Sequence, residues 1–285
     1  MINCKKCQTK RIPDKANFCP NCGYQLKPGS FEVVNVANVK SAIFNAENSA
    51  RVESVDKQFI VKGVSFKMVY VQSGTFTMGA TSEQGSNVYS DEKPTHSVRL
   101  SSYYIGETEV TQALWHAVMG SNPSYNKGGV DYPVETVSYD DCKNFISKLN
   151  SITGQNFRLP TEAEWEFAAR GGNKSRGYMY AGSDNIGSVA WYTENSGYQT
   201  HPVKKKLPNE LGLYDMSGNV REWCNDWFGT YSSYVQNNPQ GPNSGSCRVY
   251  RGGSYYSRAR YCRVSGRNDN TPSYSNSILG LRLAL

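Results

Sequence analysis

Alternating hydrophobic and polar residues predict strands in the first part of the main domain. β-type residues lie on both sides of Ser73-Gly74 between residues 66 and 79, which predicts a β-hairpin. After a polar loop at 80–94, strand character resumes between residues 97 and 105. We therefore expect this region to consist mainly of strands.

Three later stretches carry apolar residues at helical spacing. The first covers 111–119 and precedes Gly120, which can adopt the left-handed conformation of a helix C-cap. The second begins at Ser138, whose hydroxyl can cap it. The third begins after Thr161, and Glu164 three residues later completes a capping box. We expect a helix at each of these places.

The start of the third helix carries three glutamates that have two interpretations. Glu162, Glu164 and Glu166 could be catalytic carboxylates. However, the helix dipole favours acidic residues near a helix N-terminus whatever their function. We therefore expect these glutamates to be structural.

The C-terminal stretch 248–285 combines a glycine-containing frame with a polar interior. Its frame, Arg251 to Ser254 and Leu279 to Leu283, pairs glycine with β-type residues, as strands and tight turns do. Between the two ends, residues 254–277 include six Ser, four Tyr and three Asn. So few aliphatic side chains predict a surface location, and Tyr with Ser and Asn suits a binding surface. The alternative is a polar loop that closes the domain.

Composition and charge restrict the partners that we expect. The 285 residues are enough for one large domain and a small appendage. The net charge is +7, but the basic residues are scattered apart from 204–206, so we expect no specific nucleic-acid partner. Because no apolar run could span a bilayer and the start lacks a signal-peptide pattern, we expect no membrane association, a cytoplasmic location and reduced thiols.

Two CxxC pairs near the start of the chain predict a zinc site. Eleven residues separate Cys4 and Cys7 from Cys19 and Cys22, a spacing suited to one Zn²⁺ held by four thiolates. Two disulfides are the alternative, which the short spacing and the expected reducing compartment disfavour. Four thiolates leave no open coordination position, so we expect a structural zinc that holds a small ribbon at 1–27.

Six motifs in the rest of the chain resemble the formylglycine-generating enzyme family, also called sulfatase-modifying factor domains. In the family's order they occupy residues 74–79, 107–111, 133–138, 158–166, 211–223 and 251–254. The resemblance covers residues 58–285, after a linker at 28–57. It implies an irregular α+β domain of the C-type lectin type, with a small twisted antiparallel sheet, flanking helices and many loops.

The resemblance also bears on copper. The family's founding enzymes oxidise a substrate cysteine to formylglycine with copper held by two cysteines. Ser257 stands where the family has the first of these, and Cys262 lies near the position of the second. Cu(I) needs both thiolates, so we expect no copper here. The alternative is an enzyme that acts through Cys262, whose pKa four nearby arginines could lower.

The family also binds calcium through oxygen ligands. One of its sites lies beside a Gly-Asn-x-x-Glu-Trp motif, which this chain keeps at residues 218–223. Asn219, with neighbouring backbone carbonyls, could therefore ligate Ca²⁺. The alternative is that Asn219 and Glu222 only hold loops together.

A further branch of the family fits the C-terminal stretch better. Variable proteins of diversity-generating retroelements use this lectin-like domain, and mutagenesis of adenines in their C-terminal coding segment converts Asn codons to codons for Tyr, Ser, Asp and Thr. Residues 254–277 are similar to such a segment. The candidate ligand-binding residues are Tyr255, Tyr256, Ser257, Tyr261, Ser265, Asn268, Asp269, Asn270, Ser273, Tyr274 and Asn276.

The sequence leaves three functions open. The favoured one is a non-catalytic protein that presents the C-terminal surface to a protein or glycan ligand. The second is an oxidoreductase of the formylglycine-generating enzyme family that acts on cysteine. The third is a regulatory scaffold whose zinc ribbon binds a partner.

Overall fold

The structure is a computed structural model and describes residues 55–285. The chain divides into two units, Met1–Arg51 and Val52–Leu285. The predicted zinc ribbon at 1–27 lies outside the described residues, as does the predicted linker up to residue 54. Both stay predictions, and the description below concerns the second unit.

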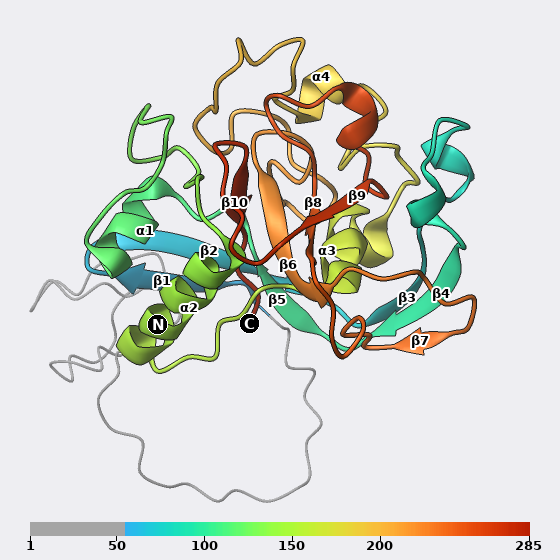
Figure 1. Ribbon diagram of the computed structural model, residues 1–285, viewed down its shortest axis with the longest axis horizontal. Helices are drawn as coiled ribbons and strands as arrows, with labels where there is room; N and C mark the ends of the chain where they lie inside the picture. Colours follow the sequence, from blue (N-terminus) through green and yellow to red (C-terminus); the bar gives the residue numbers. More distant parts are fainter. Residues whose placement is uncertain (1–54) are drawn as a thin grey trace, which may run out of the picture. The chain divides into compact units, whose positions relative to one another are not determined.

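The described strands form three small sheets, and irregular segments make up much of the chain between their strands (Figure 1). The first has the order β1-β2-β5, made of β1 (Lys57–Val61), β2 (Val64–Val71) and β5 (Tyr103–Gly106). The second has the order β3-β4-β7, made of β3 (Gly74–Met78), β4 (His96–Leu100) and β7 (Gln236–Asn237). The third has the order β10-β6-β8-β9, made of β6 (Arg221–Trp227), β8 (Arg248–Arg251), β9 (Arg267–Asn270) and β10 (Leu279–Leu281).

The predicted hairpin at residues 66–79 is wrong in its pairing. Strands β2 and β3 do flank Ser73, but β2 pairs with β1 and β5 whereas β3 pairs with β4 and β7. The Ser73 amide donates to the Ser102 hydroxyl (2.9 Å), so this short connection passes from one sheet to the next. Alternation identifies a strand, but its partner depends on contacts that are distant in sequence.

The helices follow the predicted boundaries closely. They are α1 (Gln112–Met119), α2 (Tyr139–Thr153) and α3 (Glu162–Ala169), and the structure adds a short α4 (Ile186–Val189) that the sequence did not predict. The capping box of Thr161 and Glu164 is present at α3, Ser138 caps α2, and Gly120 ends α1 with φ of 80°. Local capping chemistry therefore determined these boundaries.

Buried aromatic residues join helices to sheets. Trp115 of α1 stacks on Phe145 of α2 with ring centroids 4.8 Å apart, in a core that also includes Met68 of β2. Trp165 of α3 is fully buried in a second core, and its indole N–H donates to Glu222 Oε2 of β6 (2.6 Å). The mixture of small sheets and packed helices confirms the predicted α+β class.

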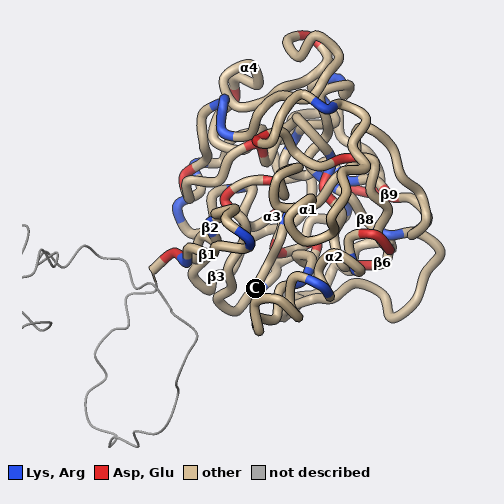
Figure 2. Tube along the Cα trace, turned by 90° about the vertical axis from the view of Figure 1, so that its left-hand side faces the viewer, with Lys and Arg blue, Asp and Glu red and all other residues tan. Residues whose placement is uncertain are grey.

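Charged residues of both signs are interspersed along the described chain (Figure 2). Among residues 55–285, no helix has the length and apolar character that crossing a membrane requires.

Candidate ligand-binding site

Buried ion pairs hold the C-terminal stretch against α3. Arg251 of β8 donates to Glu162 Oε1 (2.7 Å) and to Glu166 Oε2 (2.6 Å), which are four residues apart on one face of the helix. Arg267 of β9 binds the other oxygen of Glu162 (2.7 Å). Burial would raise the pKa of Glu162, but Arg267 and Arg251 outweigh this and hold that pKa below its ordinary value. These ion pairs fit the structural role that the sequence predicts for Glu162 and Glu166.

A second buried pair holds the middle of the stretch. Arg263 binds both oxygens of Glu92 (2.7 and 2.5 Å), and the Ser265 hydroxyl donates to Glu92 Oε2 (2.5 Å). Burial opposes ionisation of Glu92, yet the hydrogen bond from Arg263 keeps its pKa lowered. Two arginines that looked like part of a surface segment, Arg263 and Arg267, are therefore internal anchors.

Three of the predicted ligand-binding residues are buried, which corrects the expected surface location. Tyr255 is 5% exposed, Ser257 4% and Ser265 0%. The Tyr255 amide donates to the Asn219 carbonyl (2.8 Å), and the Ser257 hydroxyl accepts from the Ser254 amide (3.0 Å). A small or amphipathic side chain can complete an internal hydrogen bond as readily as it can face a ligand, and composition does not distinguish the two.

The other predicted residues keep some exposure. Tyr256 is the most prominent aromatic residue among them, because it is 62% exposed and its ring lies 5.6 Å from the ring of the similarly exposed Tyr198. The exposed group also contains Asn268 and Ser273. The partly exposed group consists of Tyr261, Asp269, Asn270, Tyr274 and Asn276.

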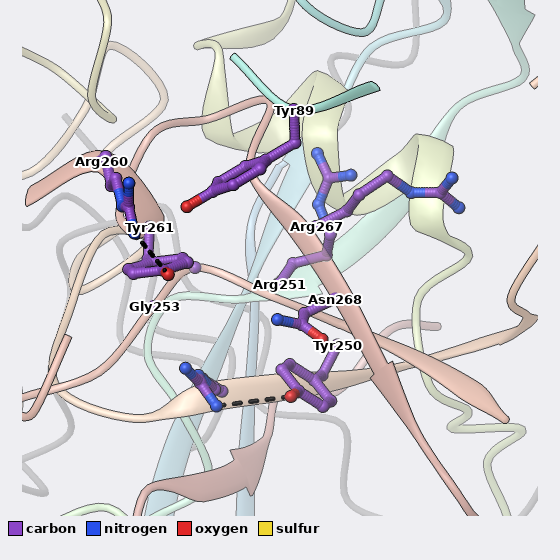
Figure 3. Close-up of a pocket in the computed structure, with 11 residues that line it drawn as sticks. Tyr89, Tyr250, Arg251, Gly253, Arg260, Tyr261, Arg267 and Asn268 are labelled. Carbon is purple, nitrogen blue, oxygen red and sulfur yellow. Dashed lines mark hydrogen bonds between the residues drawn. The ribbon is translucent and has the colours of Figure 1, made fainter. Parts of the chain in front are cut away.

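Two predicted residues line a small hollow, which we call the arginine hollow (Figure 3). Arg260, Tyr261 and Tyr89 lie on one side of it, and Tyr250 and Asn268 lie on the other. Arg221 completes this wall and donates to the Tyr250 hydroxyl (3.3 Å).

Sequence reasoning identified only Tyr261 and Asn268 of the arginine hollow. Tyr89 comes from the polar loop before β4, and Arg221 begins β6, so only the fold brings them to the C-terminal stretch. The available signal was the unusual number of arginines between residues 248 and 267. That signal did not show which of these arginines form ion pairs with buried carboxylates and which do not.

Cys262 is fully buried, and its pKa is raised to about 12 by burial, which outweighs the opposing effect of Arg221. The raised pKa argues against the alternative in which nearby arginines lower it. Arg263 and Arg267 are paired with carboxylates and so supply little net positive potential to the sulfur.

We predict that Cys262 resists alkylation in the folded protein. At pH 8 a thiol with a pKa of about 12 is ionised in only about one molecule in 10⁴. Iodoacetamide treatment followed by peptide mass spectrometry should label the half-buried Cys247 first and Cys262 only after denaturation. Labelling of Cys262 at the rate of Cys247 in the native protein would contradict the prediction.

Asn219 has protein partners on both atoms of its amide. Its oxygen accepts from the His201 amide (3.0 Å), and its nitrogen donates to Glu109 Oε2 (2.9 Å). This arrangement matches the alternative in which Asn219 holds loops together. Within residues 55–285 no group of three or more His, Cys, Asp or Glu could hold a metal ion. Calcium binding at Asn219 stays a prediction.

Comparisons with known sequences give one family. The model of the "Sulfatase-modifying factor enzyme 1-like domain" matches residues 61–285. The chaperone protein LppX of Paenibacillus barcinonensis is 35% identical over 71% of this chain and 83% of its own length. The formylglycine-generating enzyme of Streptomyces coelicolor is 31% identical over 76% of this chain and 88% of its own length.

Solved structures with a similar fold include a variable protein. Treponema denticola variable protein 1 has a TM-score of 0.72 and 38% sequence identity, covering 81% of this chain and 98% of its own. PvdO from Pseudomonas aeruginosa has a TM-score of 0.66 and 25% identity, covering 80% and 97%. The fold is thus shared by proteins whose names indicate different functions.

Proposed function

Because the chain belongs to the family of sulfatase-modifying factor enzyme 1-like domains, we propose that it uses this C-type lectin-like fold to bind a ligand without catalysis. The binding surface consists of the exposed residues of the C-terminal stretch. One observation carries the proposal: Tyr256, Tyr261 and Asn268 remain accessible on a stretch that buried ion pairs fix to the core. The buried ion pairs hold the backbone of the stretch rigidly, while its Tyr and Asn side chains offer contact area and hydrogen bonds. This combination suits recognition of a ligand.

The likeness to a variable protein supports diversification of this surface. We propose that adenine mutagenesis varies the exposed positions and spares the buried ones, since only the former can change without loss of the fold. The neighbouring DNA tests this. A reverse transcriptase gene and a near-copy of the coding segment for 254–277 that differs at adenines would support it, and absence of both would refute it.

The second candidate is an oxidoreductase that acts on cysteine, which the likeness to formylglycine-generating enzymes favours. Ser257 and the buried Cys262 supply only one thiol, whereas soft copper sites use a thiolate pair. Copper-dependent oxygen consumption with a cysteine peptide, abolished in Cys262→Ala, would displace ligand binding as the main function.

We predict that stability separates the two classes of position. Tyr256→Ser and Asn268→Ser should change the free energy of unfolding by about 0.5 kcal/mol or less, as is usual at exposed sites. Ser265→Tyr should cost more than about 2 kcal/mol, because it overfills a buried site and removes a hydrogen bond to Glu92. Urea unfolding measures all three, and a neutral Ser265→Tyr would contradict the assignment of Ser265 to the interior.

A further inference from the structure

The arginine hollow contains positive charge that no described carboxylate compensates. Arg251 and Arg267 line it but are paired with two buried glutamates of α3. Arg221 and Arg260 have no ion pair with any described residue and donate instead to tyrosine hydroxyls, Arg260 to Tyr261 at 2.9 Å. No Asp or Glu lines the hollow. Its wall therefore carries two net positive charges.

Two donors in this wall lack partners. The Nε atoms of Arg251 and Arg260 are buried and make no hydrogen bond within the described part of the chain. Arg251 itself is almost fully buried, so leaving a donor unpaired there has a free-energy cost. Positive charge and unused donors together fit an acceptor that carries negative charge.

Of the tyrosines that line the hollow, Tyr261 has a lowered pKa, whereas burial raises the pKa of Tyr89 and Tyr250. Tyr89 and Arg260 lie beside the Tyr261 hydroxyl and hold the pKa of Tyr261 below its ordinary value. The ring of Tyr261 stacks on that of Tyr89 with centroids 5.7 Å apart, and the Arg260 guanidinium lies 4.8 Å from the Tyr261 ring centroid. The guanidinium is thus held in place before any ligand arrives, which reduces the entropy lost on binding.

We propose that the arginine hollow is an anion subsite that takes a carboxylate side chain of an acidic polypeptide ligand. The inference rests on the proposed binding function and names the chemistry of its ligand. A planar carboxylate matches the donor geometry of guanidinium groups. A neutral sugar carries no negative charge to compensate the guanidinium groups of Arg221 and Arg260.

The edge of the adjoining sheet favours a polypeptide over an acidic sugar. Strand β9 is an outer strand of its sheet, and among the strands of residues 55–285 it pairs only with β8. The amides of Asp269 and Thr271 donate to the side-chain oxygens of Asn268 and Asn270, both at 2.9 Å. These local bonds can be exchanged for carbonyls of an extended peptide that lies along β9, while one of its carboxylates enters the hollow.

The experiment compares four proteins on an array that carries immobilised 12-residue peptides of graded Asp and Glu content and uronic-acid oligosaccharides. The proteins are the full-length chain, Arg221→Gln/Arg260→Gln, Asn268→Asp and a matched control, Arg99→Gln/Lys143→Gln. The control loses the same net charge at exposed positions outside the hollow. Asn268→Asp adds a competing carboxylate at an exposed site, so it tests the hollow even if the double arginine variant fails to fold.

We expect acidic peptides to bind the wild type and the control, and binding to weaken by about tenfold or more in Arg221→Gln/Arg260→Gln and in Asn268→Asp. An equal loss in the control would overturn the inference, since net charge alone would then explain binding. Stronger retention of uronic-acid oligosaccharides than of peptides would overturn the polypeptide assignment.

The inference and the proposed function fail in different ways. If peptides bind regardless of acidity, and binding is lost in Tyr256→Ala but not in the arginine variant, the anion subsite is refuted while the binding surface stands. If neither peptides nor oligosaccharides bind the wild type, the inference is refuted, and the array gives the proposed function no support.

Discussion

Glu162→Gln is expected to lower the free energy of unfolding by about 3–5 kcal/mol, because it removes one partner from a buried charge network. Glu162 accepts from Arg251, Arg267 and the Tyr231 hydroxyl (3.0 Å) while only 4% exposed. Without its negative charge, Arg267 loses its ion pair among the described residues, and Arg251 keeps only Glu166, which Arg170 also uses. Chemical denaturation with urea measures the change.

Glu107→Gln is the matched control for this prediction. It makes the same chemical change at a glutamate whose partners, Lys67 and Lys204, are substantially exposed. Exposed ion pairs contribute about 0–1 kcal/mol, so the control should lose far less stability. Equal losses in the two variants would show that the buried network is not what holds the C-terminal stretch to α3.

The parts of the fold that the sequence predicted well are those fixed by local chemistry. Thr161 and Glu164 determine where α3 begins, and Gly120 determines where α1 ends, whatever surrounds them. The pairing of β2 and β3 was wrong because strand partners are chosen by packing across the whole domain. The family resemblance supplied the architecture that periodicity alone did not.

The sequence predicted which segment carries the site, but not which of its side chains are exposed. Tyr255, Tyr256 and Ser257 are adjacent and chemically similar, yet only Tyr256 faces outward. Burial of each side chain depends on where the chain turns after Arg251, where Gly253 approaches Cys262 so closely that a Cβ would lie 2.6 Å from its sulfur. The contribution of Tyr89 and Arg221 depends on contacts that no local pattern contains.

Asp226→Asn is expected to stabilise the protein by an amount that grows with pH. Burial, reinforced by the charge of Glu162, raises the pKa of Asp226 to about 8 from an ordinary value of 3.8. Between pH 3.8 and pH 8 the Asp226 carboxyl is protonated in the folded state but ionised in the unfolded chain. Its contribution to the free energy of unfolding therefore falls as pH rises through this range, and it no longer changes above about pH 8. Asparagine cannot ionise, and its oxygen can still accept from the Glu162 amide, as Asp226 Oδ2 does at 2.9 Å.

The difference in unfolding free energy between Asp226→Asn and the wild type isolates this group, because other titrations occur in both proteins. It should rise by up to about 1.4 kcal/mol per pH unit between pH 4 and pH 8. Glu162, whose lowered pKa acts in the opposite direction, cancels in the comparison. The exposed Asp140→Asn serves as control and should give only a small difference. If the difference in unfolding free energy between Asp226→Asn and the wild type does not change with pH, Asp226 is ionised in the folded protein. The ion pairs around Glu162 must then accommodate a further negative charge.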